Sequence, residues 1–194
     1  MSVSSSGENV TTTRAGDGFE RRAFTAEEIY RMQDLGIIDD DEGFELIEGD
    51  IVMMPSKNAP HERFKLALNR ALSRALPDTL QLGVETSLVL GERAIFEPDL
   101  SVFPMMDSTS VRGPDVLLAI EVATTTLRKD LKLKAALYAK YGVRELWVID
   151  TTALATTIHR APERGVWRSV EKLPADAVLT HPCAPGFAIR LADL

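Results

Sequence analysis

The sequence predicts an α/β (α+β) fold in which a mixed β-sheet is flanked by helices, with an N-terminal helix and a β-hairpin as an extension. Residues 116–123 and 144–150 are apolar runs of the kind that form strands buried on both faces, and residues 127–142 between them have a helical pattern. A strand, a helix and a strand in this order predict parallel pairing. Two segments that resemble hairpins, 43–55 and 82–103, predict antiparallel pairing, so the sheet should be mixed.

The composition is that of one globular domain. Of the 194 residues, 45% are hydrophobic and 26% are charged, and we expect a disordered tail over 1–20 followed by a single domain over 21–194. No apolar run is long enough to span a membrane, and the polar N-terminus lacks the apolar centre of a signal peptide. The single cysteine, Cys183, fits a cytoplasmic protein. The net charge of −7 argues against unpatterned coating of DNA, but it leaves room for a local basic groove.

The first elements are a helix and a hairpin. A helix should begin after Thr25, because Glu28 completes a capping box, and it should end near Gly36. The hairpin should turn at residues 48–50 and end at Pro55. Glu45 alternates with its apolar neighbours in the first strand of the hairpin, so this segment alone favours a solvated outer face for it.

A second helix is predicted over residues 60–76. Its apolar stripe is formed by Phe64, Leu68, Leu72 and Leu76. His61 lies one turn before this stripe, on the inward side. A single histidine at such a position is more often a surface or capping residue than a functional one.

Residues 82–90 and 94–103 are predicted as two strands joined around residues 91–93. Pro98 lies inside the second strand and should break its ladder, because proline has no backbone N–H to donate. Asp99 follows directly, which is a suitable place for a sheet edge to open onto a site.

Glu121 and Lys134 are charged residues at positions predicted to be buried. Glu121 lies within the apolar strand 116–123, where an ionised carboxylate must be paired, hydrogen-bonded or bound to metal. A salt bridge to a core lysine is the ordinary explanation. Lys134 falls near the middle of the apolar arc of helix 127–142. A helix that joins two parallel strands packs back over the sheet, so Lys134 should face Asp99 or Glu121.

Short strands are expected over residues 155–160 and 165–170, followed by an irregular end over 181–194.

Together, Asp99, Glu121 and Lys134 predict a hydrolytic site. Two hard oxygen ligands suit Mg²⁺ or Mn²⁺, which take their remaining ligands from water and substrate phosphate. The lysine would orient or deprotonate the nucleophile and add positive charge, as in-line hydrolysis of a phosphodiester requires.

These residues resemble the PD-(D/E)XK nuclease superfamily, in which P-D is followed by E-V on the next strand. The segments FELIEGDIVMMP, HERF, FEPDLSVF and DVLLAIEVATTTLRKDLKLKAALYAKYGVRELWVID are similar to the Uma-two family of putative restriction endonucleases. The similarity extends from about residue 23 to residue 194. It implies a restriction-endonuclease-like core, a divalent metal, and DNA as the substrate.

The resemblance also assigns roles to individual residues. It makes Asp99 and Glu121 the metal ligands and Lys134 a catalytic residue, and it raises Glu45 to a candidate catalytic residue. His61 matches a recurrent histidine and receives a supporting role. The superfamily lysine would stand at position 123, which is alanine here, whereas Lys134 fills the lysine position of the Uma-two helix. Threonines at 124–126 replace the usual serine-proline-serine.

Two other functions stay open. The fold could serve as a catalytically inactive DNA- or protein-binding module whose carboxylates form only salt bridges, or the protein could act on a small phosphorylated or nucleotide substrate. The basic residues that could meet phosphates are Lys57, Arg63, Arg70, Arg128 and Lys129. Each of them, taken singly, is better explained as an ordinary surface charge. A homodimer is expected only by analogy with nucleases that cut two strands.

Overall fold

The structure is a computed structural model that describes residues 12–14, 20–39, 42–54, 57–106 and 111–194. Its chain divides into two compact units. The first contains residues 1–54 and 91–96, and the second contains residues 55–90 and 97–194. Among the described helices, none has both the length and the apolar character needed to cross a membrane.

The first unit contains the N-terminal helix and the first hairpin. Its elements are β1 (Thr12–Arg14), β2 (Glu20–Arg22), α1 (Ala26–Asp34), β3 (Phe44–Ile47), β4 (Asp50–Met53) and β7 (Ala94–Phe96). The capping box forms as predicted, with Thr25 accepting from the Glu28 N–H and Glu28 accepting from the Thr25 N–H. Strand β3 pairs antiparallel with both β4 and β7. Strand β1 and the first residue of β2, Glu20, lie within the expected tail 1–20, whereas residues 1–11 and 15–19 lie outside the described residues, as does Pro55.

The second unit contains most of the elements. Its helices are α2 (Ala59–Ala75), α3 (Leu127–Lys129) and α4 (Ala135–Lys140), with a π-helical turn η2 (Asp130–Lys134) between the last two and short 3₁₀ turns η1 (Gly113–Asp115) and η3 (Leu191–Asp193). Its strands are β5 (Leu80–Val84), β6 (Leu88–Gly91, ending where the chain enters the first unit), β8 (Leu100–Pro104), β9 (Leu118–Ala123), β10 (Glu145–Asp150), β11 (Ala155–Glu163), β12 (Val166–Leu173), β13 (Leu179–His181) and β14 (Ala184–Ile189).

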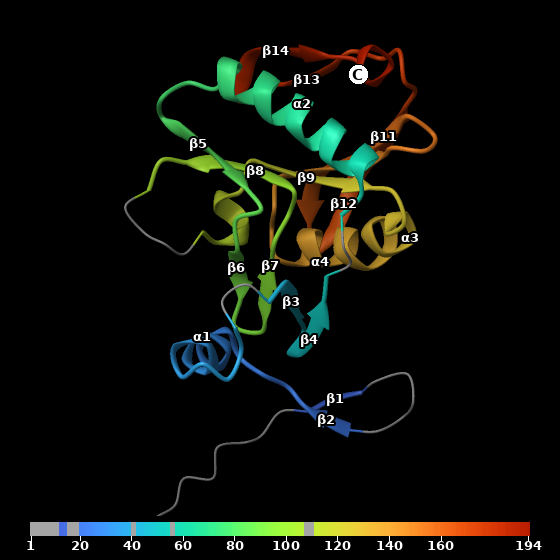
Figure 1. Ribbon diagram of the computed structural model, residues 1–194. Helices are drawn as coiled ribbons and strands as arrows, with labels where there is room; N and C mark the ends of the chain where they lie inside the picture. Colours follow the sequence, from blue (N-terminus) through green and yellow to red (C-terminus); the bar gives the residue numbers. More distant parts are fainter. Residues whose placement is uncertain (1–11, 15–19, 40–41, 55–56, 107–110) are drawn as a thin grey trace, which may run out of the picture. The chain divides into compact units, whose positions relative to one another are not determined.

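A six-stranded mixed sheet organises this unit, in the order β12-β11-β10-β9-β8-β5. The pair β9–β10 is parallel, as the strand-helix-strand pattern predicts, and the other neighbours are antiparallel. Helix α2 lies over one face of the sheet, and the segment from α3 to α4 lies over the other (Figure 1). The predicted fold class, a mixed sheet flanked by helices, is therefore confirmed.

The core lies between α2 and the sheet. It contains Phe64, Leu68 and Leu72 of α2 together with Leu100, Val102, Leu118, Ile120, Val122, Trp147 and Ile149 of the sheet. Side chains alternate along a strand, so the residues between these, among them Glu121, face the side covered by α3 and α4. The core under α2 thus determines which face of β9 carries the carboxylate.

Two sequence predictions are wrong. The expected strand 82–90 is divided at residues 85–87, where Glu85 adopts a left-handed φ of 49°. The expected strand 94–103 is divided at residues 97–99, and this break is the one that Pro98 predicts. The expected irregular end, 181–194, contains strand β14, which pairs with β13 just before it and packs against α2. The two strands bury Leu179, Ala184 and Phe187, but each strand is too short to show an alternating apolar pattern in the sequence.

Candidate active site

Glu121 is a buried carboxylate at the centre of the sheet. It is 5% exposed in β9, with β8 and β10 on its two sides. Its Oε1 lies 2.6 Å from the Lys134 ammonium and accepts a hydrogen bond of 2.6 Å from the Tyr138 hydroxyl. An uncompensated carboxylate at this depth would be destabilised by several kcal/mol. Lys134 and Tyr138 therefore allow Glu121 to remain charged inside the protein.

The crossover segment brings both partners to Glu121. Lys134 is 4% exposed and Tyr138 is fully buried, and they are four residues apart, so they lie on one face of the helix. The N–H of Ala135 donates to the carbonyl of Asp130, five residues earlier, which makes residues 130–134 a π-helical turn. Such turns occur inside α-helices, frequently at functional sites. The prediction that Lys134 lies on the buried face is confirmed.

Asp99 lies where strand β8 begins, next to β9. Its Oδ2 accepts a 2.7 Å hydrogen bond from the N–H of Val122, the residue after Glu121. The antiparallel register pairs Leu100 with Ile120, so continuing it by one residue places Asp99 opposite Glu121. Residues directly opposite in an antiparallel pair share a face of the sheet. The strand register therefore brings the two predicted carboxylates to one end of the sheet.

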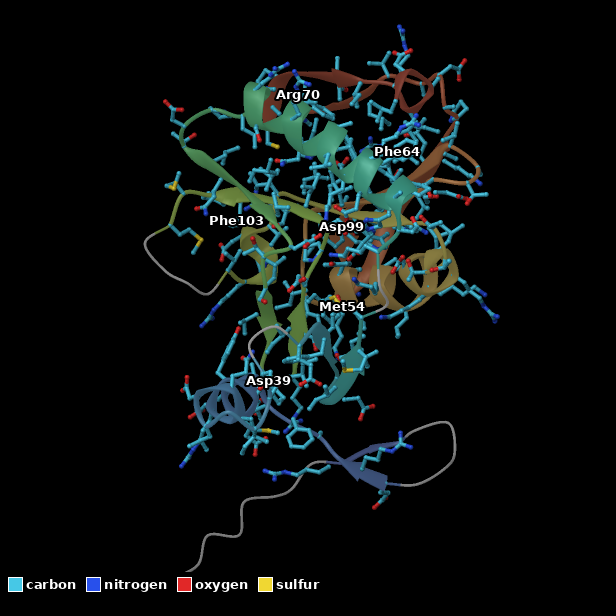
Figure 2. All side chains as sticks on the ribbon, in the orientation of Figure 1. Asp39, Met54, Phe64, Arg70, Asp99 and Phe103 are labelled. Atoms are coloured by element: carbon cyan, nitrogen blue, oxygen red, sulfur yellow. The ribbon has the colours of Figure 1, made fainter. Side chains whose placement is uncertain are left out.

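Cationic groups from α2 and the segment before it surround Asp99. Its Oδ1 lies 2.9 Å from Nε2 of His61 and 3.8 Å from the Lys57 ammonium. Figure 2 shows Asp99 beside the helix that carries Phe64. Burial alone would lower the pKa of His61, but hydrogen bonds and charge from Asp99 and then Glu62 raise it overall. Asp99 thus favours the protonated form of the His61 ring, and the predicted inward position of His61 is confirmed.

Glu45 lies in the first unit. It is 1% exposed in β3, opposite Val52 of β4. The solvated outer face that its own segment favours is therefore wrong. Strand β3 lies between β4 and β7 and is covered on that face, and a four-residue segment carries no signal for this burial.

Two kinds of partner were not predicted from the sequence. Tyr138 follows Lys134 by four residues, and this spacing could have identified it as a second partner of Glu121. The sequence marks Lys57 only as a basic residue that could meet phosphates, and no sequence signal pairs it or Glu85 with Asp99.

The carboxylates provide a donor set for a hard cation. Within the described residues, no group of three or more His, Cys, Asp or Glu side chains could hold a metal ion. Mg²⁺ is, however, often bound by one or two carboxylates and completes its shell with water and substrate phosphate. Asp99 and Glu121 at one end of the sheet fit this kind of site.

Comparison with known proteins identifies a family and a related fold. The family model Uma2, described as "Putative restriction endonuclease", matches residues 26–192. A crystal structure described as a putative nuclease belonging to DUF820, from Anabaena variabilis, aligns with a TM-score of 0.68. The alignment covers 88% of this chain and 96% of the other at 17% sequence identity, which establishes a common fold. Among curated proteins, no sequence matches this chain.

Proposed function

Because this chain belongs to the Uma2 family, we propose that it is a metal-dependent endonuclease that hydrolyses phosphodiester bonds of DNA. The observation that carries the proposal is the burial of Glu121 with Lys134 beside the sheet end that holds Asp99. Charged groups buried together in this way, at positions where an apolar core would be simpler, are characteristic of catalytic sites.

Each residue has a distinct role in this proposal. Asp99 and Glu121 bind Mg²⁺ or Mn²⁺, which when bound supplies positive charge to the phosphate and acidifies a water molecule. Lys134 orients the attacking water or stabilises the negative charge that develops on the phosphate. Tyr138 fixes the orientation of the Glu121 carboxylate through its hydrogen bond to Oε1.

Two further residues are included in the proposal. His61 supports Asp99 by donating from Nε2 to its Oδ1, which holds that carboxylate in one orientation. Glu45 is proposed as a further catalytic residue on the basis of the family pattern and its burial in β3. A buried carboxylate in a short hairpin strand is unusual enough to suggest a role beyond packing.

The test is DNA cleavage in the presence and absence of metal. Supercoiled, linear and single-stranded DNA are incubated with the protein in Mg²⁺, Mn²⁺ or a chelator, and we expect cleavage only with metal. The Asp99→Asn variant should lose at least about 100-fold in rate, because it removes a charged ligand while keeping its shape. Asp78→Asn, an exposed carboxylate after α2, is the matched control and should cleave like the parent.

Two results would refute the proposal: every form of DNA stays intact with both metals, or Asp99→Asn cleaves as well as the parent.

The second candidate function, a binding module with the same fold, is favoured by one observation. Both carboxylates are already paired with cations of the chain itself, Glu121 with Lys134 and Asp99 with His61. Retained DNA binding without Mn²⁺ binding would support that alternative.

The proposal includes a cytoplasmic homodimer. The single cysteine fits a reducing compartment, and two copies would place one site on each DNA strand. Sedimentation velocity with and without duplex DNA measures the assembly directly.

A further inference from the structure

Lys57 links Asp99 to a group of charged residues outside the catalytic set. Its ammonium lies 2.6 Å from Oε1 of Glu85 and 3.8 Å from Oδ1 of Asp99. The same Glu85 oxygen also contacts the ammonium of Lys65, whose residue is only 6% exposed. Lys57 therefore bridges the proposed metal ligand Asp99 and a carboxylate that has a second, buried cation.

Glu85 is fixed in place independently of Lys57. Its backbone N–H donates to the carbonyl of Asp99 at 3.2 Å, which ties the break after β5 to the start of β8. Lys65 holds its side chain from helix α2 and also pairs with Glu62 at 2.8 Å. Glu85 is thus a firm anchor for the Lys57 ammonium beside Asp99.

The contacts of Lys57 are unequal. The distance to Asp99 is that of an ion pair, beyond hydrogen-bond range, whereas the distance to Glu85 is that of a charge-assisted hydrogen bond. The Lys57 side chain is also 28% exposed, unlike the buried Lys134. Lys57 can therefore give up its contact with Asp99 without losing its main partner.

We propose that Lys57 is a built-in counter-cation on the Asp99 side of the site and that it lowers the affinity of the site for a divalent cation. This inference rests on the proposed function, because it takes Asp99 as a metal ligand. A positive charge within 4 Å of a carboxylate oxygen stabilises that carboxylate but repels a divalent ion brought to it. Glu85 retains Lys57 when the ion binds.

The test measures Mn²⁺ binding without DNA, by calorimetry and by the electron paramagnetic resonance signal of free Mn²⁺. Lys57→Met should bind Mn²⁺ about two- to fivefold more tightly than the parent, since the pair it removes is partly exposed. Lys57→Arg keeps the charge and should bind like the parent. The matched control is Arg74→Met, which removes one exposed positive charge in the last turn of α2, about 19 Å along the helix from His61.

A double variant connects the effect to Asp99. In an Asp99→Asn background, Lys57→Met should give no gain in Mn²⁺ affinity, whereas a general change in surface charge would still give one. Thermal melts establish that all variants are folded.

The outcomes separate this inference from the proposed function. If the parent binds Mn²⁺ and Lys57→Met binds it equally or more weakly, the counter-cation role is refuted while the metal site stands. If neither protein binds Mn²⁺, both proposals are refuted. The counter-cation role is supported if Lys57→Met binds Mn²⁺ more tightly than the parent, Lys57→Arg and Arg74→Met do not, and the gain disappears in the Asp99→Asn background.

Discussion

The two carboxylates of the proposed site are held in opposite ways. Glu121 contacts Lys134 and Tyr138, and both of these come from the crossover segment that follows its own strand. Asp99 is instead surrounded by an amide of the neighbouring strand and by His61 and Lys57, which come from a segment about 40 residues earlier in the chain. The charge of Glu121 is balanced by buried groups that are close to it in the sequence. The charge of Asp99 is balanced by groups that are distant in the sequence, one of which is partly exposed.

The lysines beside the two carboxylates differ in their exposure to solvent. The Glu121 side has a lysine that is nearly inaccessible to solvent, so its charge balance is part of the folded core. The Asp99 side has a partly exposed lysine, so its charge balance can change when a ligand arrives. We infer that the charge of Lys134 acts mainly on the stability of the fold and that the charge of Lys57 acts mainly on the affinity for a ligand.

The largest effect on stability is expected from Lys134→Met. This change leaves Glu121 buried without its ammonium partner, so the free energy of unfolding should fall by ~3–5 kcal/mol. Urea denaturation measures the change. Lys57→Met, on the Asp99 side, should lower the free energy of unfolding by only ~0–1 kcal/mol, because the Lys57–Asp99 pair is partly exposed.

Lys132→Met is the control for Lys134→Met, since Lys132 is exposed in the same turn and its loss should change stability by less than ~0.5 kcal/mol. The double variant Lys134→Met/Glu121→Gln should recover part of the stability. Equal losses for Lys134→Met and Lys57→Met would contradict the distinction between the two carboxylates.

A smaller effect is expected from Tyr138→Phe. The change removes only the hydroxyl that donates to Glu121, and a hydrogen bond to a charged group contributes ~1.5–3 kcal/mol. Urea denaturation should show a loss in this range in the parent and a smaller one in a Glu121→Gln background. A loss of the same size in both backgrounds would mean that the hydroxyl acts on something other than the charge of Glu121.

The smallest expected effect is a change in pH dependence caused by His61. Asp99 and Glu62 raise the pKa of His61 above its ordinary value despite its burial. Its contribution to stability is therefore complete below the unfolded pKa of about 6.5 and is lost as the pH rises through the folded value. In chelator, the stability difference between the parent and His61→Gln should be larger at pH 6 than at pH 8.

Titration of the His61 ring by NMR provides an independent check in the metal-free protein. Its pKa should lie above that of His159, whose pKa is lowered by burial. The reverse order would show that Asp99 does not hold His61 as a cation.

Local sequence patterns predicted much of the fold. The capping box at Thr25 and Glu28 uses neighbouring residues only, and the parallel pair β9–β10 follows from a strand-helix-strand order that has few alternatives. The division of residues 82–90 at Glu85 could not be predicted in this way. It depends on a left-handed backbone held by contacts with Asp99 and Lys65, which are distant in the sequence.

The same distinction applies to the site. Glu121 and Lys134 stand out because each violates the apolar pattern of its own element, and the fold places them 2.6 Å apart. Lys57 violates no local pattern, and Glu85 lies within a segment that the sequence predicts as an ordinary strand. The pairing of β5 with β8 brings Glu85 next to Asp99, and Lys57 comes from the segment just before α2, so only the structure reveals these contacts.

The π-helical turn has a consequence for the face of the crossover helix that meets the sheet. A turn with hydrogen bonds five residues apart shifts the phase of a helix, so that a single wheel of about 100° per residue does not describe both of its ends. Leu127 and Leu131, which that wheel assigns to the buried arc, are accordingly only half-buried, whereas Leu137 and Tyr138 are buried. The face that carries Lys134 and Tyr138 is therefore offset from the face of the first turn, and this fixed offset points the pair at Glu121.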